Sequence, residues 1–217
     1  MIQKVLIRGV TYREAAHLAN DSIDLDSKKG ARDLAILRVL YNTGARVQEV
    51  CSLRAKDIRV ISPYMATLHG KGNKVRQVPL WKETVEALRP VLEGKESLDS
   101  IFCTRGEPLT RFGIRYIVKK YSSLAEKECP TIKEKKVGPH TFRHTTAMHL
   151  LQSGTDISVI KSWLGHVDLN TTHSYVEIDM EMKRDAISKL AGQSQSKKIN
   201  KLLDRNKDVV EWLSNFK

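Results

Sequence analysis

Hydrophobic residues near the start of the chain recur at the spacing of an amphipathic helix. Leu34, Leu37, Leu40 and Tyr41 lie three or four residues apart, which places them on one face of a helix. Gly44 follows directly, and glycine is the residue that most often ends a helix. We therefore expect a helix that stops at Gly44, followed by a second short helix that begins near residue 47.

A small β region is predicted next. Residues 57–61, 65–69 and 75–80 have the length and the flanking residues of short strands. The run Gly70-Lys71-Gly72-Asn73 separates the last two strands and is typical of a tight turn. We expect an antiparallel hairpin with Lys71 at its tip.

The rest of the chain is predicted to be helical. The expected helices cover about 81–92, 110–125, 141–153 and 157–164, with Gly154 as a stop and Asp156 as an N-cap, and two more short helices near 170–190. A linker over 192–196 precedes an amphipathic helix over 199–216. The predicted fold class is mainly α with a small antiparallel β-sheet, divided into an N-terminal arm (1–30), a main domain (31–191) and a C-terminal linker and helix (192–217).

The charge of the chain favours a polyanionic partner. Its 217 residues include 37 Lys and Arg against 25 Asp and Glu, a formal net charge of +12. Such an excess is typical of proteins that bind nucleic acid. The three cysteines are far apart, and neither a long apolar run nor a signal-peptide pattern is found. We expect a cytoplasmic protein that associates with the nucleoid.

The candidate chemistry is exchange of a phosphodiester bond without a metal or other cofactor. Such a reaction needs a side-chain oxygen as nucleophile, fixed cations around the phosphate and a proton donor for the leaving oxygen. The sequence offers each of these. The candidates are Arg46 in the run 43–50, Lys71 at the hairpin tip, His140 and Arg143 at a helix start, His166 after Leu164-Gly165, and Tyr175.

These segments resemble the conserved boxes of tyrosine recombinases, the phage integrase family, in order, spacing and context over roughly residues 30–190. The resemblance implies an integrase-type catalytic domain that cuts and rejoins DNA at specific sites through a 3′-phosphotyrosyl intermediate, without metal or ATP. It also implies a role for each residue. Tyr175 is the nucleophile, Arg46 and Arg143 stabilise the transition state, Lys71 is the general acid, His140 is acid/base on Tyr175, His166 binds the phosphate and Glu49 supports the site. Expected DNA contacts are Lys74, Arg76, Arg111 and Arg115.

The resemblance also implies partners. Double-stranded DNA is the expected substrate, held by a homotetramer in which helix 199–216 docks onto a neighbouring subunit. Family members usually carry a separate helical DNA-binding domain, and the 45 residues before Arg46 are too few for it, so we expect either a naturally short recombinase or a fragment of a longer one.

Three alternatives remain. His140, His144 and His149 could suggest a metal site, but no acidic residue falls between the first two and Arg143 would repel a cation. Residues 141–164 also have the outline of a helix-turn-helix, as in a DNA-binding protein without catalysis. A type IB topoisomerase, which uses the same catalytic apparatus, would relax supercoils without site preference.

Overall fold

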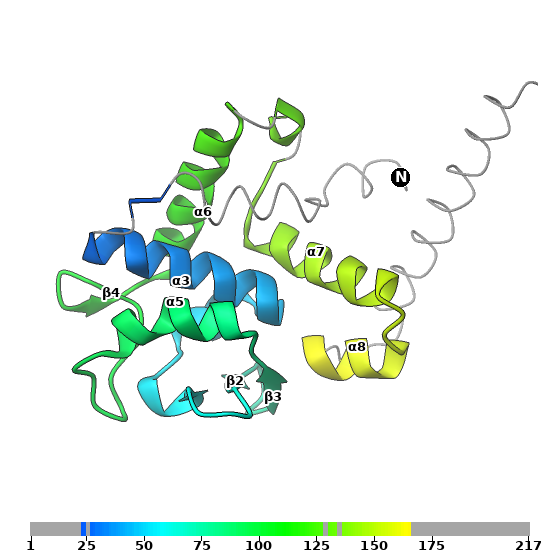
Figure 1. Cartoon of the computed structure of the whole chain (residues 1–217), viewed down its shortest axis with the longest axis horizontal. Coiled ribbons are helices and arrows are strands. Elements are labelled where there is room, and N and C mark those ends of the chain that lie inside the picture. The colour runs from blue at the N-terminus through cyan, green and yellow to red at the C-terminus, as the bar shows by residue number, and fades with distance from the viewer. Residues whose placement is uncertain (1–22, 25–26, 128–129, 134–135, 166–217) are drawn as a thin grey trace, which may run out of the picture. The chain divides into compact units, whose positions relative to one another are not determined.

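The computed structural model (Figure 1) describes residues 23–24, 27–127, 130–133 and 136–165. The chain divides into two compact units, Met1–Val176 and Glu177–Lys217, and all described residues belong to the first. The expected helices near 170–190, the linker over 192–196 and the helix over 199–216 lie outside the described residues.

Helix α3 (Lys28–Thr43) is the centre of the described fold. The hydroxyl of Ser27 accepts a hydrogen bond from the Gly30 amide at its start, and Gly44 ends it with a φ of 58°. The helix begins inside the segment expected to be an N-terminal arm. It contacts α5 (Lys82–Leu92), α6 (Arg111–Ala125) and α7 (Pro139–Gln152), as Figure 1 shows. Because other helices pack on several sides of α3, more of its residues are buried than the apolar face predicted from the sequence.

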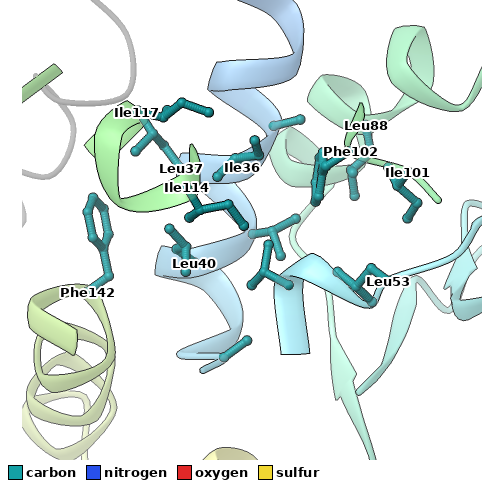
Figure 2. Close-up of a cluster of buried hydrophobic side chains, with 14 of the residues drawn as sticks. Ile36, Leu37, Leu40, Leu53, Leu88, Ile101, Phe102, Ile114, Ile117 and Phe142 are labelled. Carbon is teal, nitrogen blue, oxygen red and sulfur yellow. The ribbon is translucent and has the colours of Figure 1, made fainter. Parts of the chain in front are cut away.

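The hydrophobic core forms around α3. Figure 2 shows side chains from α3, from the segment after α4 (Val47–Cys51), from α5, α6 and α7 meeting in one cluster. The labelled members are Ile36, Leu37, Leu40, Leu53, Leu88, Ile101, Phe102, Ile114, Ile117 and Phe142, all of them buried. This cluster joins the elements that carry the candidate site residues.

The predicted three-stranded sheet is present, and its two outer strands are shorter than predicted. β1 (Ile58–Arg59), β2 (Met65–His69) and β3 (Val75–Pro79) form an antiparallel sheet in the order β1-β2-β3, after a short 3-10 helix over Ala55–Asp57. In the hairpin, Met65 pairs with Pro79 and His69 with Val75. The predicted fold class is therefore confirmed.

Two features differ from the prediction. A second ribbon pairs β4 (Cys103–Thr104) with β5 (Glu107–Pro108) around a left-handed turn at Arg105 and Gly106. Its two-residue strands are too short to show an alternating apolar pattern, so the sequence analysis did not predict them. A single 3-10 turn over Pro130–Ile132 precedes α7, which starts two residues before the predicted helix.

The last described helix, α8 (Ile157–Leu164), has the predicted boundaries. The Asp156 carboxylate accepts a hydrogen bond from the Ser158 amide at 2.8 Å, which confirms the predicted N-cap. Gly165 ends the helix with a φ of 63°. Residue 165 is therefore held in a defined turn immediately before His166.

Candidate functional site

A buried ion pair lies at the centre of the candidate site. The guanidinium of Arg76 donates from both terminal nitrogens to the two carboxylate oxygens of Glu49, each at 2.8 Å. Glu49 is 3% exposed and Arg76 is 12% exposed. A two-bond contact of this kind fixes both side chains because it constrains their orientation as well as their distance.

The same carboxylate holds Arg46 in place. Arg46 lies at the N-terminus of α4, and its backbone N–H donates to Glu49 Oε2 at 2.7 Å while its guanidinium reaches Oε1 at 3.3 Å. Burial would raise the pKa of Glu49, but the hydrogen bonds and charges of Arg76 and Arg46 outweigh it and lower that pKa. Glu49 is therefore a stable anion, and this result fits its predicted supporting role.

Arg46 and the hairpin face a common cleft. The cleft has a volume of about 360 Å³ and is lined by Arg46, Gly70, Lys71, Lys74, Val75, Arg76 and Gly165. The side chain of Arg46 is 40% exposed, so its guanidinium is available to a ligand in this cleft. Four cations that the sequence analysis identified in two separate segments thus line one cleft.

The hairpin tip presents Lys71 and Lys74 to solvent. Gly72 and Asn73 both have positive φ, 73° and 56°, the pattern of a turn that matches the twist of the paired strands. The Gly70 amide donates to the Lys74 carbonyl at 2.7 Å and closes the hairpin below the turn. Both lysines are exposed, and both line the cleft.

Arg143 is buried and joins two segments. Its guanidinium donates to the carbonyl of Gly44 at 2.7 Å and to the carbonyl of Leu164 at 2.6 Å. Gly44 lies two residues before Arg46, and Leu164 lies directly before Gly165 at the cleft. Arg143 therefore ties the start of α4 to the end of α8, from its own position on α7.

His140 lies in a second cleft. This cleft has a volume of about 440 Å³ and is lined by basic side chains of α6, of the following loop and of α7, together with small and apolar residues. The lining residues are Arg115, Lys119, Lys136, Val137, Gly138, Pro139, His140, Thr141 and His144. His140 is thus exposed in this second cleft, whereas the guanidinium of Arg143, three residues along the same helix, is buried against the carbonyls of Gly44 and Leu164.

The predicted DNA contacts fall into two groups. Arg111 and Arg115 are exposed on α6, next to Phe112 and Tyr116, which are 72% and 67% exposed. Arg76, in contrast, uses its guanidinium for protein partners, and its Nε donates to the Trp163 carbonyl at 2.9 Å. Its first role is thus to hold Glu49 and the end of α8. A sequence signal existed, because Glu49 lies between Val47 and Val50 in an expected helix, and a carboxylate needs a cation once it is buried.

Tyr175 and His166 lie outside the described residues. Among residues 23–24, 27–127, 130–133 and 136–165, no group of three His, Cys, Asp or Glu could hold a metal ion. In the same part of the chain, no helix combines the length and the apolar character that crossing a bilayer requires.

The model of the phage integrase family matches residues 10–182. Tyrosine recombinase XerC of Bacillus subtilis (strain 168) is 37% identical over 174 residues, covering 75% of this chain and 54% of the relative. Tyrosine recombinase XerD of Ralstonia nicotianae is 34% identical over 169 residues, covering 74% of this chain and 53% of the relative. The chain thus spans about half the length of these relatives.

Two solved structures are similar in fold. The XerH site-specific recombinase, in a post-cleavage complex with its palindromic difH substrate, has a TM-score of 0.71 at 27% identity, covering 84% of this chain and 53% of that one. The XerA recombinase has a TM-score of 0.67 at 29% identity, covering 82% of this chain and 64% of that one.

Proposed function

This chain belongs to the phage integrase family, and from that membership we propose that it cuts and rejoins DNA at specific sites through a covalent bond between Tyr175 and phosphate. The observation that carries the proposal is the cleft between the hairpin and α4. Arg46 and Lys71 open onto it, the buried pair of Glu49 and Arg76 supports it, and Gly165 borders it directly before His166.

The proposed reaction conserves bond energy. The oxygen of Tyr175 attacks the phosphorus, the bond from phosphorus to the 5′ oxygen breaks, and a 3′-phosphotyrosyl bond replaces it. Lys71 gives its proton to the leaving 5′ oxygen, and His140 takes the proton of Tyr175. A 5′ hydroxyl of a partner strand then reverses the step. No external energy source is needed, because one phosphodiester bond replaces another.

The cations act on the phosphate in two ways. Arg46 is fixed by Glu49 before substrate arrives, so its charge needs no reorganisation as negative charge grows on the phosphate oxygens. Arg143 is the second proposed cation of the transition state. Its bonds to Gly44 and Leu164 hold the segments on both sides of the cleft at a fixed separation. Positioning and fixed positive charge together supply the acceleration.

The proposed substrate is double-stranded DNA. The exposed cations of the second cleft and of α6 provide phosphate contacts, and Phe112 and Tyr116 beside them provide apolar contact area. The similar XerH structure holds its difH DNA substrate. Lys74, Arg111 and Arg115 remain the proposed DNA contacts, and the protein would act in the cytoplasm at the nucleoid.

We further propose a homotetramer on two DNA sites. Exchange between two duplexes requires four cuts, and a ring of four subunits needs a contact that each makes with the next. The apolar stripe predicted over 199–216 is suited to dock onto a neighbour, because a helix of this length is marginal in water unless the stripe is buried.

A suicide substrate tests the proposed function. Nicked duplexes taken from DNA flanking the gene should trap a covalent complex, visible as a shifted protein band under denaturing conditions. Tyr175→Phe should bind the same DNA with unchanged Kd and form no adduct, since only the attacking oxygen is lost. Tyr64→Phe, a half-buried tyrosine of the sheet region, is the matched control and should form the adduct normally.

Other outcomes would replace the proposal. Adduct formation by Tyr175→Phe would exclude this residue as the nucleophile. Relaxation of supercoiled plasmid without preference for a site would indicate a topoisomerase. Site-specific binding without any adduct would indicate a DNA-binding protein that does not cut.

A further inference from the structure

We infer that Arg76 is a positioning residue that joins three segments of the active site, and that its effect is on the rate of cutting rather than on DNA binding. The inference rests on the proposed function. The three segments are α4 with Arg46, the hairpin with Lys71, and the turn at Gly165 that leads to His166. Arg76 contacts or belongs to each of these three segments.

The first link is to α4. Both terminal nitrogens of Arg76 bond the carboxylate of Glu49, which in turn accepts from the backbone and the guanidinium of Arg46. Without Arg76, only Arg46 itself would hold the Glu49 carboxylate among these contacts, so the plane of the carboxylate would be less constrained. The orientation of Arg46 in the cleft therefore depends on Arg76.

The second link is to the end of α8. The Nε of Arg76 donates to the carbonyl of Trp163, across 87 residues of sequence. The guanidinium also packs against the backbone of Gly165, where a Cβ atom would lie only 3.1–3.2 Å from Arg76 Cδ, Nη1 and Nε. Arg76 thus fixes the turn from which the chain continues into His166.

The third link is to the hairpin. Arg76 lies in β3, one residue beyond the pair of His69 with Val75 that closes the ladder. Directly after the neighbouring strand β2, a Cβ atom at Gly70 would lie 3.2 Å from Glu49 Oε1. Glycine at position 70 therefore lets the base of the hairpin approach the ion pair closely, with Lys71 next to it.

Only arginine suits this position. Its planar fork supplies parallel donors for two carboxylate oxygens and a third donor for a carbonyl. A lysine keeps the charge, but its single ammonium group cannot hold the Glu49 carboxylate in a fixed plane and also reach Trp163. Arg76→Lys is therefore a specific probe of positioning, because it leaves the net charge of the protein unchanged.

The experiment measures adduct formation on the suicide duplex at saturating DNA, together with Kd by fluorescence anisotropy and the unfolding temperature. We expect Arg76→Lys to remain folded, to bind DNA within about twofold of wild type, and to form the adduct at least about tenfold more slowly. Arg89→Lys is the matched control. Arg89 is exposed on α5 and also donates to a backbone carbonyl, that of Val60, so its substitution should leave the rate unchanged.

A double variant separates positioning from other roles. Glu49→Gln should also slow cutting at saturating DNA. The double variant Glu49→Gln with Arg76→Lys should be no slower than the slower single variant, because both changes break one arrangement. If the double variant is slowed by the product of the two single-variant factors, the inference is overturned. The inference is also overturned if Arg76→Lys only raises the Kd for DNA and cuts at the wild-type rate at saturating DNA, because Arg76 would then be a DNA contact.

A second variant covers the case in which Arg76→Lys does not fold. Gly70→Ala leaves every charge in place, yet its Cβ atom presses on Glu49 Oε1. It should slow cutting about threefold or more at saturating DNA, since a small displacement in an active site has a large effect on rate. An unchanged rate would overturn the inference. If wild type itself forms no adduct, the proposed function and this inference both fail; if wild type cuts and Arg76→Lys equals it, only the inference fails.

Discussion

Replacing Gly44 by alanine should destabilise the protein through one defined contact. Gly44 ends α3 in the left-handed region, with φ 58° and ψ 25°, and its amide donates to the Leu40 carbonyl. A Cβ atom at this position would lie 2.5 Å from Leu164 Cδ2 and 3.4 Å from the Thr146 side chain. Leu164 is fully buried, so any movement of its side chain must be accommodated inside the core.

The magnitude follows from two contributions. The left-handed conformation costs a residue with a Cβ atom about 1–2 kcal/mol. Overlap with a buried side chain adds about 1–3 kcal/mol. Gly44→Ala should therefore lower the free energy of unfolding by about 2–5 kcal/mol, which for a unit of this size corresponds to roughly 4–20 °C in Tm.

Gly94 provides the matched control. It also has a left-handed φ, 70°, but nothing lies within 4 Å of the Cβ atom that alanine would add. Gly94→Ala should therefore show only the conformational cost of about 1–2 kcal/mol. The comparison isolates the contact between the start of α4 and the end of α8.

Urea unfolding, followed by far-UV circular dichroism, measures both variants. If Gly44→Ala and Gly94→Ala lower the free energy of unfolding by amounts that agree within about 0.5 kcal/mol, the contact between Gly44 and Leu164 does not contribute as inferred. The same variants separate stability from function. Gly44→Ala should also slow adduct formation, because Arg143 bonds the carbonyls of Gly44 and Leu164, whereas Gly94→Ala should cut normally.

Three further predictions concern other parts of the chain. Lys71→Ala should slow cutting of normal DNA about 10²-fold or more, and a 5′-bridging phosphorothiolate should largely restore it because its leaving group needs no proton; equal defects on both substrates would make Lys71 a DNA contact only. Burial lowers the pKa of His149, whose Nδ1 lies 2.7 Å from the Tyr41 hydroxyl, so the unfolded chain binds the proton more tightly and stability should fall as pH drops below 6.5. Urea unfolding across pH should show a flatter slope for His149→Asn, and an unchanged slope would contradict this. Deleting residues 193–217 should leave DNA binding intact and abolish recombination in a two-site plasmid assay; normal recombination would exclude trans docking of the C-terminal helix.

Much of the described fold could be predicted from the sequence. The boundaries of β2 and α8, the helix stop at Gly44 and the N-cap Asp156 are all confirmed. These features depend on residues within one or two turns of each other, so local pattern and turn chemistry are sufficient to define them. The ribbon of β4 and β5 was not predicted, because two-residue strands carry no periodicity.

The sequence alone also determined the chemistry that the chain can offer. The proposed nucleophile, cations and proton donors occur in the order of a known family, and membership of that family is confirmed. Which of these groups meet was decided by tertiary structure. Arg76 pairs with Glu49 across 27 residues, and Arg143 bonds Gly44 across 99. Such partners are chosen by packing around α3, because a buried charge must find its partner wherever the fold brings one, and no local pattern specifies that distance in sequence.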